Sequence, residues 1–237
     1  MLKGLQLVLP PDSVFSCETA ARIWSLPTAK VDGEVVHIRT TAQVRRAKVV
    51  AHVGQLGEVT RHRDMGVTTP IQTFLDLAVH LDDRWLLAVG DAIVRRGLGD
   101  RAALVAAADR STSRRGAVRA RRVAALVRPG VDSPMESLLR HLHLASGLPE
   151  PVINANAHDS HGGWIARPDL SYPDRKLAIE YDGRHHFDDR RQWENDIARR
   201  HNLEDEGWVV RIATARDVLV QSDRFGADML FLWRRRR

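Results

Sequence analysis

The segment that most constrains the fold of this chain runs from Arg167 to His186, with the sequence RPDLSYPDRKLAIEYDGRHH. Its middle, residues 173–176, contains proline and aspartate, which favour turns for backbone reasons. The pattern predicts two short strands joined by a tight turn, with Tyr172 paired to Leu177. Because side chains two residues apart on a strand share a face, this register predicts a core face made of Leu170, Tyr172, Leu177, Ile179 and Tyr181.

The opposite face of the same hairpin is acidic. The register sets Asp169 opposite Glu180 and Arg167 opposite Asp182, so three carboxylates converge on one side. Directly opposed strand residues have Cβ atoms roughly 4.5–5.5 Å apart, and like charges there destabilise the pair. A shared proton or a bound cation removes this penalty, and Mg²⁺ prefers carboxylates combined with water and phosphate oxygens. We therefore expect a metal site, the alternative being a solvated acidic face.

The same residues resemble a known nuclease signature. Pro168-Asp169, followed after ten residues by Glu180-Tyr181-Asp182, is similar to the PD-(D/E)xK signature. The later residues extend the likeness to the Vsr-like branch, and especially to the domain-of-unknown-function 559 family. Over residues 133–237 this likeness includes Asp182-Gly183-Arg184-His185-His186, Trp193, Asp196, Arg199, Leu203 and Gly207-Trp208-Val209-Val210-Arg211.

The resemblance implies a restriction-endonuclease-like mixed sheet flanked by helices, and Mg²⁺- or Mn²⁺-dependent hydrolysis of DNA phosphodiester bonds. It implies that Asp169 and Glu180 hold the metal together with the backbone carbonyl of Tyr181. The lysine of the general signature is replaced by Asp182, so Asp182 must act as a ligand or a base. Lys176 lies in the predicted turn and is a poor substitute for that lysine.

Glu136 has two interpretations. It follows Ser133 by three residues, which is the spacing of a capping box at the start of a helix. Taken alone, this spacing indicates a helix cap. In the family that the chain resembles, the helix before the sheet carries a glutamate at the metal site, and Glu136 is the matching position. The resemblance therefore adds Glu136 to the expected metal ligands.

Two adjacent histidines follow the acidic strand. His185 and His186 come within four residues of Asp182. A neutral imidazole can accept a proton from water, and an imidazolium can stabilise a leaving oxygen. The alternative is a pair of ordinary surface histidines in a loop. We expect at least one of them to assist proton transfer.

Arginine is concentrated between residues 110 and 128, where acids are almost absent. Val118, Val123, Ala124 and Val127 predict a helix with a narrow apolar stripe and an arginine rim. Such a helix can lie along a phosphate backbone, or it can be a solvated linker. A second candidate contact lies on a later helix, where Arg199 either faces a phosphate or pairs with Asp196. The predicted nucleic-acid contacts are Arg114, Arg115, Arg119, Arg121, Arg122, Arg167 and Arg199.

Composition divides the chain into an α+β region at 1–109, a basic helix or linker at 110–132 and the nuclease-like region at 133–237. The first region resembles the AbiEi antitoxin-like group; its expected strands are 35–39, 49–53 and 58–63, and its expected helices are 18–24, 69–78, 85–96 and 101–108. In the last region, we expect strands at 151–157, 164–172, 177–182 and 208–213, the last one central, and helices from 133, at 192–206 and at 222–233. The predicted class is α/β.

Charge and composition narrow the expected function. The formal net charge of +6 favours a polyanionic partner, and a hydrophobic fraction of 43% suffices for a buried core. The single cysteine, Cys17, cannot form an internal disulfide, and no apolar run approaches the roughly 20 residues that span a bilayer. We expect a cytoplasmic deoxyribonuclease of DNA repair or defence without a membrane partner, as a monomer or a homodimer. The alternatives are a non-catalytic, antitoxin-type DNA-binding regulator built on a nuclease scaffold, and a ribonuclease.

Overall fold

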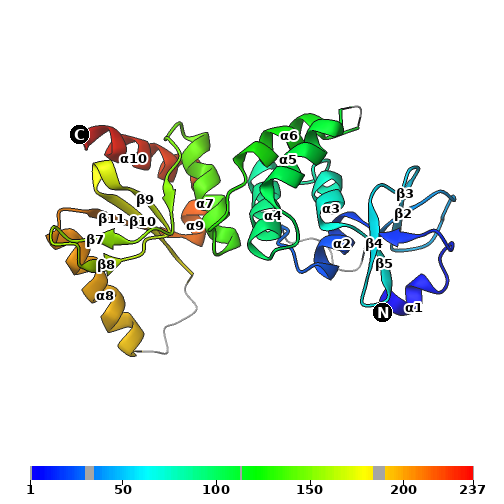
Figure 1. Ribbon diagram of the computed structural model, residues 1–237, viewed down its shortest axis with the longest axis horizontal. Helices are drawn as coiled ribbons and strands as arrows, with labels where there is room; N and C mark the ends of the chain where they lie inside the picture. The colour runs from blue at the N-terminus through cyan, green and yellow to red at the C-terminus, as the bar shows by residue number, and fades with distance from the viewer. Residues whose placement is uncertain (1, 30–34, 113, 184–189, 237) are drawn as a thin grey trace. The chain divides into compact units, whose positions relative to one another are not determined.

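The computed structural model describes residues 2–29, 35–112, 114–183 and 190–236, with the backbone alone for residues 190–196 (Figure 1). The chain divides into two compact units, Met1–Pro129 and Gly130–Arg237. Each unit combines helices with a β-sheet that contains both parallel and antiparallel neighbours, so the chain has the mixed α/β class expected from its sequence.

The N-terminal unit contains a five-stranded sheet in the order β3-β2-β1-β5-β4. Strand β1 runs antiparallel to β2 and parallel to β5. The described strands are β1 (Val14–Phe15), β2 (Val36–Thr40), β3 (Val49–Val53), β4 (Val59–His62) and β5 (Met65–Thr68). The described helices are α1 (Leu2–Gln6), α2 (Cys17–Ile23), α3 (Pro70–Leu77), α4 (Asp83–Arg95), α5 (Arg101–Arg110) and α6 (Ala117–Leu126).

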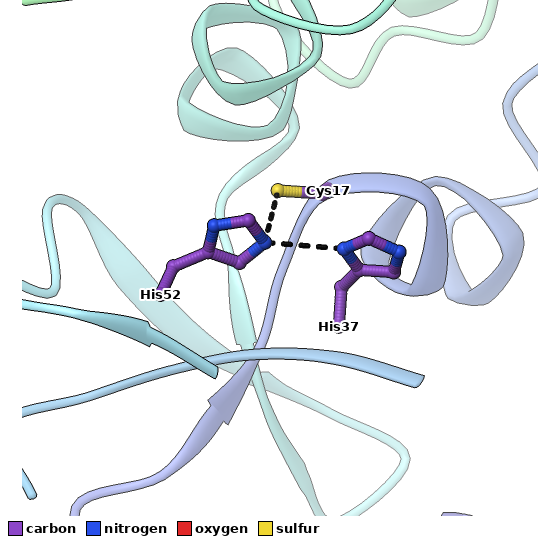
Figure 2. Close-up of side chains that lie close together, drawn as sticks. All are labelled: Cys17, His37 and His52. Atoms are coloured by element: carbon purple, nitrogen blue, oxygen red, sulfur yellow. Dashed lines mark hydrogen bonds between the residues drawn. The ribbon is translucent and has the colours of Figure 1, made fainter. Parts of the chain in front are cut away.

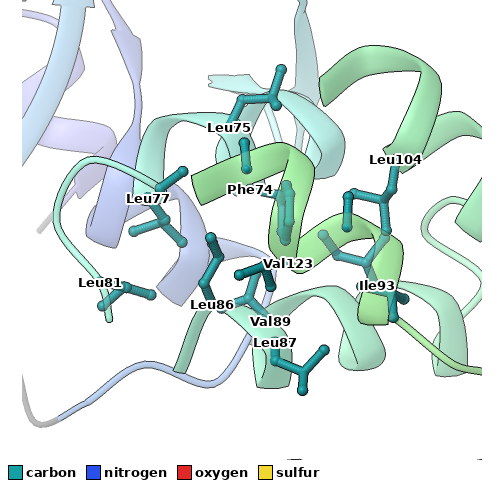
Figure 3. Packing of buried hydrophobic residues seen from close by; sticks show 14 of the residues in the cluster. Phe74, Leu75, Leu77, Leu81, Leu86, Leu87, Val89, Ile93, Leu104 and Val123 are labelled. Carbon is teal, nitrogen blue, oxygen red and sulfur yellow. The ribbon is translucent and has the colours of Figure 1, made fainter. Parts of the chain in front are cut away.

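Two apolar clusters build this unit, and α2 contributes to both. One cluster joins α2 and the sheet through residues such as Phe15, Ala20 and Ile38. The larger cluster joins α2 to the helices α3–α6; Figure 3 shows part of it, including Phe74, Leu86, Ile93, Leu104 and Val123. Side-chain caps start three of these helices, because Thr69, Asp82 and Asp100 accept hydrogen bonds from backbone N–H groups of the following turn.

The basic segment is part of this core. The buried side of α6 consists of Ala117, Ala120, Val123 and Ala124, and the following Val127 is buried as well. Val118, which we expected on the apolar stripe, is 67% exposed instead. Ala117 and Ala120 occupy buried positions of α6 instead, and their small side chains let the helix approach its neighbours closely. The segment up to residue 129 thus belongs to the N-terminal unit.

The C-terminal unit contains a four-stranded sheet in the order β11-β10-β9-β6 and a separate two-stranded pair, β7-β8. Its described strands are β6 (Val152–Ile153), β7 (Ala157–His158), β8 (Trp164–Ala166), β9 (Leu170–Tyr172), β10 (Leu177–Asp182) and β11 (Val209–Thr214). Its described helices are α7 (Pro134–Ala145), α8 (Arg190–Asp205), α9 (Ala215–Leu219) and α10 (Ser222–Arg235), with a 3-10 turn at Pro173–Arg175.

The predicted hairpin register is confirmed. Strands β9 and β10 are antiparallel, and Tyr172 pairs with Leu177 across the turn. In contrast, β11 is not central: it lies at the edge of the described sheet and pairs in parallel with β10. The expected single strand at 164–172 is divided between β8 and β9. Pro168 lies at the break, and proline cannot donate a ladder hydrogen bond. This break places Asp169 immediately before β9.

Both faces of the C-terminal sheet are covered by other elements. On the face of Ala178 and Val210, a cluster includes Leu203 of α8 and residues of the β7-β8 pair. Helices α7, α9 and α10 pack against one another, and α7 also contacts β10. Figure 1 shows these three helices on the side of the sheet opposite α8. The strand ends, rather than the sheet faces, are therefore where polar side chains can gather.

Candidate functional site

Asp169 is held at the open end of the β9-β10 hairpin, just before β9. Its Oδ2 accepts a hydrogen bond of 2.7 Å from the backbone N–H of Tyr181. Burial raises the pKa of Asp169 to about 6, although the Tyr181 hydrogen bond acts in the opposite direction. The negative charges of Glu136, Glu180 and Asp132 raise this pKa further. Three acids from two other regions of the sequence thus act on Asp169.

Glu136 is buried in the first turn of α7 and is 6% exposed. Ser133 caps the helix by accepting a hydrogen bond from the Glu136 N–H at 3.2 Å. The Glu136 carboxylate does not close a capping box on Ser133: its Oε2 accepts from the backbone N–H of Asp132 at 2.9 Å and from Asn154 Nδ2 at 2.8 Å. Glu136 therefore shapes the helix start and also contributes charge at Asp169.

The other two predicted acids lie further along β10. Glu180 is partly buried and acts on Asp169, whereas Asp182 is exposed. Within the described residues, no three of these carboxylates have oxygens within 4.8 Å of one another. The acids that act on Asp169 do not form a closed cage within the described residues. Such an open group suits a cation that takes one or two carboxylates and keeps several waters, as Mg²⁺ does.

Sequence reasoning missed two polar residues of this group. Asp132 raises the pKa of Asp169, and Asn154 donates to Glu136 from the loop after β6. Asp132 had one visible signal, since it directly precedes the capping residue Ser133. Asn154 had none, because its position depends on how β6 pairs with β9.

Arg167, which we expected opposite Asp182, lies in the break between β8 and β9, outside the described β9-β10 ladder. Its Nη2 lies 3.0 Å from Asp132 Oδ2, and its Nε donates to the backbone carbonyl of Asn154 at 2.8 Å. Arg199 lies on α8 and is partly buried. The two predicted proton-transfer residues, His185 and His186, are outside the described residues.

The arginines of the basic segment are partly neutralised by acids that are distant in sequence. Arg114 Nη2 lies 2.6 Å from Asp76 Oδ1, and Arg119 Nε lies 3.2 Å from Asp83 Oδ1. Arg122 binds the Asp83 carboxylate with two hydrogen bonds, of 2.7 and 2.9 Å. Within the described chain, Arg115 and Arg121 are the members of this predicted set that are exposed and make no such bond to an acid.

Comparisons with known proteins give relatives but no activity. No family model and no solved structure matches the chain. Two curated relatives, the uncharacterized proteins Rv2248 and MT2308 from two strains of Mycobacterium tuberculosis, are each 29% identical to it over 195 residues. The match covers 82% of this chain and 66% of each relative, so the chain spans just under two thirds of their length.

Among the described helices, none combines the length and the apolar character that crossing a membrane requires.

Proposed function

We propose that the chain is a Mg²⁺- or Mn²⁺-dependent endonuclease that hydrolyses phosphodiester bonds of DNA, with its active site around Asp169. One observation carries this proposal: Asp169 is a buried carboxylate whose pKa is raised to about 6 and which feels the charges of Glu136, Glu180 and Asp132. Grouped acids at the ends of strands are costly to maintain, and perturbed carboxylates of this kind concentrate at functional sites.

The donor set fits a hard divalent cation. The described donors gathered there are carboxylate oxygens, and Mg²⁺ and Mn²⁺ prefer carboxylate and water oxygens. Asp169 and Glu180 are the proposed ligands, with the Tyr181 carbonyl and Glu136 beside them. When bound, the cation would activate a water molecule and stabilise the charge that develops on the phosphate.

The chain's own residues supply position and proton transfer in this proposal. The Tyr181 N–H fixes one oxygen of Asp169, and Asn154 with the Asp132 N–H fixes one oxygen of Glu136. Asp182, exposed at the end of β10, is a proposed acceptor for the proton of the attacking water, together with His185 or His186. Lys176 is held at the opposite end of β10, where its Nζ donates to the Glu206 carbonyl at 2.6 Å.

The element order supports a restriction-endonuclease-like arrangement for the C-terminal unit. A helix, an antiparallel strand pair, a crossover helix and a parallel strand follow one another as α7, β9-β10, α8 and β11. We further propose that DNA is the polymer bound, because the chain carries a net charge of +6 and exposes Arg115 and Arg121.

The test is a cleavage assay on supercoiled plasmid, mismatched duplex, single-stranded DNA and RNA, with Mg²⁺, Mn²⁺ or EDTA. We expect cutting of DNA that EDTA abolishes. Asp169→Asn should remove activity, because the amide keeps the acceptor for the Tyr181 N–H but loses the ligand charge. Asp174→Asn is the matched control: Asp174 is exposed in the turn at the opposite end of the same hairpin.

The outcomes separate the candidate functions. RNA cleavage without DNA cleavage would indicate a ribonuclease. Metal-independent DNA binding without any cleavage would favour an antitoxin-type regulator and would overturn the enzymatic proposal. Full activity in Asp169→Asn would remove this acidic group from the mechanism.

A further inference from the structure

A second group of metal-binding side chains lies in the N-terminal unit. It joins Cys17, the first residue of α2, to His37 on β2 and His52 on the neighbouring β3 (Figure 2). Cys17 Sγ lies 3.5 Å from His52 Nε2, and His37 Nδ1 lies 3.1 Å from the same nitrogen. The three ligand atoms all lie within 4.8 Å of one another.

These separations match the edges of a tetrahedral metal site. With Zn–S of about 2.3 Å and Zn–N of about 2.05 Å, tetrahedral angles give S···N edges of about 3.6 Å and N···N edges of about 3.3 Å. The measured values of 3.5 and 3.1 Å are close to both edges. The side chains therefore need only small shifts to surround one ion.

Hydrogen bonding alone satisfies this group poorly. A ring nitrogen of neutral histidine is either one donor or one acceptor. His52 Nε2 faces both the Cys17 sulfur and His37 Nδ1, so one proton or one lone pair must serve two partners. A cation at the centre would instead accept one lone pair from each of the three residues.

An outer carboxylate strengthens the case. Glu18 Oε2 is buried 3.5 Å from His37 Nε2, and it accepts no hydrogen bond within the described residues. A histidine that binds metal through one nitrogen usually donates its other N–H to a carboxylate or carbonyl, which fixes the ring. His37 has this arrangement: Nδ1 points toward the cluster (Figure 2), and Nε2 is the nitrogen that lies beside the Glu18 carboxylate.

The cluster opens on one side to a cavity of about 630 Å³. Cys17, His52 and His80 line it, and the His80 ring centroid lies 5.9 Å from that of His52. Three protein ligands with an open fourth position are typical of zinc sites that exchange a water or a substrate, whereas closed structural sites use four protein ligands.

We propose that Cys17, His37 and His52 bind Zn²⁺, or a similar first-row transition ion, with the fourth coordination position directed to this cavity. Sulfur and imidazole donors select such ions over Mg²⁺, so this site and the acidic group around Asp169 call for different metals. The proposal is independent of the proposed nuclease activity.

Titrating the reduced full-length chain with Co²⁺, in excess Mg²⁺, tests this site directly. Cys17 is the only cysteine in the sequence, so any thiolate-to-cobalt charge-transfer band must arise from it. We expect that band together with the strong visible bands of tetrahedral cobalt, and we expect one equivalent of Zn²⁺ to abolish both. A chain with a free thiol and no charge-transfer band on Co²⁺ addition would overturn the proposal without affecting the nuclease assay.

Variants then assign the ligands. Cys17→Ser should remove the charge-transfer band, and His52→Ala should weaken Zn²⁺ affinity more than 100-fold in competition with a chromophoric chelator. Glu18→Gln should weaken it by about 10–100-fold, as expected for a partner of a ligating histidine. His161→Ala, an exposed position of the other unit, and Asp169→Asn are the controls and should bind Zn²⁺ normally. Unchanged affinity in His52→Ala, with far-ultraviolet circular dichroism confirming a folded chain, would contradict the assignment.

Discussion

At the scale of single residues, the protonation of Asp169 is the property with the widest consequences. The folded-state pKa of about 6 lies above the ordinary value of 3.8. The folded chain therefore holds a proton on this carboxyl more tightly than the unfolded chain does. The resulting stabilisation is complete below about pH 4 and is lost as the pH rises through about 6.

The first prediction concerns stability against pH. Asp169→Asn keeps the hydrogen-bond acceptor but cannot ionise, so its free energy of unfolding should lose this pH dependence. At pH 8 the variant should be more stable than the parent chain by up to roughly 3 kcal/mol. Urea unfolding without divalent ions, at several pH values between 4 and 8, measures the difference. Asp174→Asn should follow the parent, and a parallel pH profile for Asp169→Asn would refute the raised pKa.

The second prediction concerns metal binding at the same carboxyl. Protons and Mn²⁺ compete for Asp169, so the apparent affinity should fall about tenfold for each pH unit below 6 and level off above it. Isothermal titration calorimetry of Mn²⁺ into the Cys17→Ser chain measures this without interference from the cysteine–histidine group. An affinity that does not change between pH 5 and 7 would show that Asp169 is not a ligand.

At the scale of elements, α6 packs against α4 within the N-terminal unit. Gly90 lies in α4 close to Val127, which follows α6. A Cβ added to Gly90 would come within 2.5 Å of Val127 Cγ2. The basic segment therefore contributes to the core of this unit.

The third prediction tests this packing. Gly90→Ala should lower the free energy of unfolding by about 1–3 kcal/mol, because the new methyl group overpacks the α4–α6 contact. Gly4→Ala is the control, since Gly4 is also helical and a Cβ there meets nothing within 4 Å. That control should be neutral or stabilise by up to about 1 kcal/mol. Thermal unfolding followed by circular dichroism compares the two, and a neutral Gly90→Ala would mean that α6 packs loosely.

The fourth prediction separates the arginines of α6. Both side chains are exposed, but Arg122 already binds Asp83. If this helix contacts phosphates, Arg121→Ala should weaken DNA binding and reduce the slope of log affinity against log salt by about one. Arg122→Ala should change that slope less. Fluorescence anisotropy with labelled duplex over a salt series gives both slopes, and identical slopes for parent and Arg121→Ala would exclude Arg121 as a phosphate contact.

At the scale of the whole molecule, the two units offer different donor chemistries. Sulfur and imidazole nitrogen gather in the unit Met1–Pro129, and carboxylate oxygen gathers in the unit Gly130–Arg237. Hard ions favour the oxygen group, and zinc favours the nitrogen–sulfur group.

The fifth prediction is that two ions stabilise the chain through separate residues. A ligand that binds only the folded state raises the unfolding temperature. In differential scanning calorimetry, Cys17→Ser should lose the shift caused by Zn²⁺ and keep the shift caused by Mn²⁺, while Asp169→Asn should do the reverse. Loss of both shifts in either variant would show that one site accounts for both ions.

Local patterns made much of the fold predictable. The alternation around the turn at 173–176 fixed the β9-β10 register, and Thr69-Pro70 marked the start of α3, because these signals depend on neighbouring residues alone. The exposure of Val118 and the edge position of β11 were not predictable in this way. Both depend on which distant elements pack alongside.

The sequence by itself determined that Asp169 and Glu180 would lie near each other at the open end of the β9-β10 hairpin, since strand periodicity and a short turn fix neighbours within a hairpin. Only the tertiary structure decided which other acids join them: Asp132 and Glu136 take part, and Asp182 stays exposed. The tertiary structure also brings together Cys17, His37 and His52. His37 and His52 are 15 residues apart along the chain, and Cys17 and His52 are 35 residues apart. Long-range contacts of this kind arise because α2 packs on the sheet. That packing depends on the burial of apolar surface across the whole unit, which a local sequence pattern does not reveal.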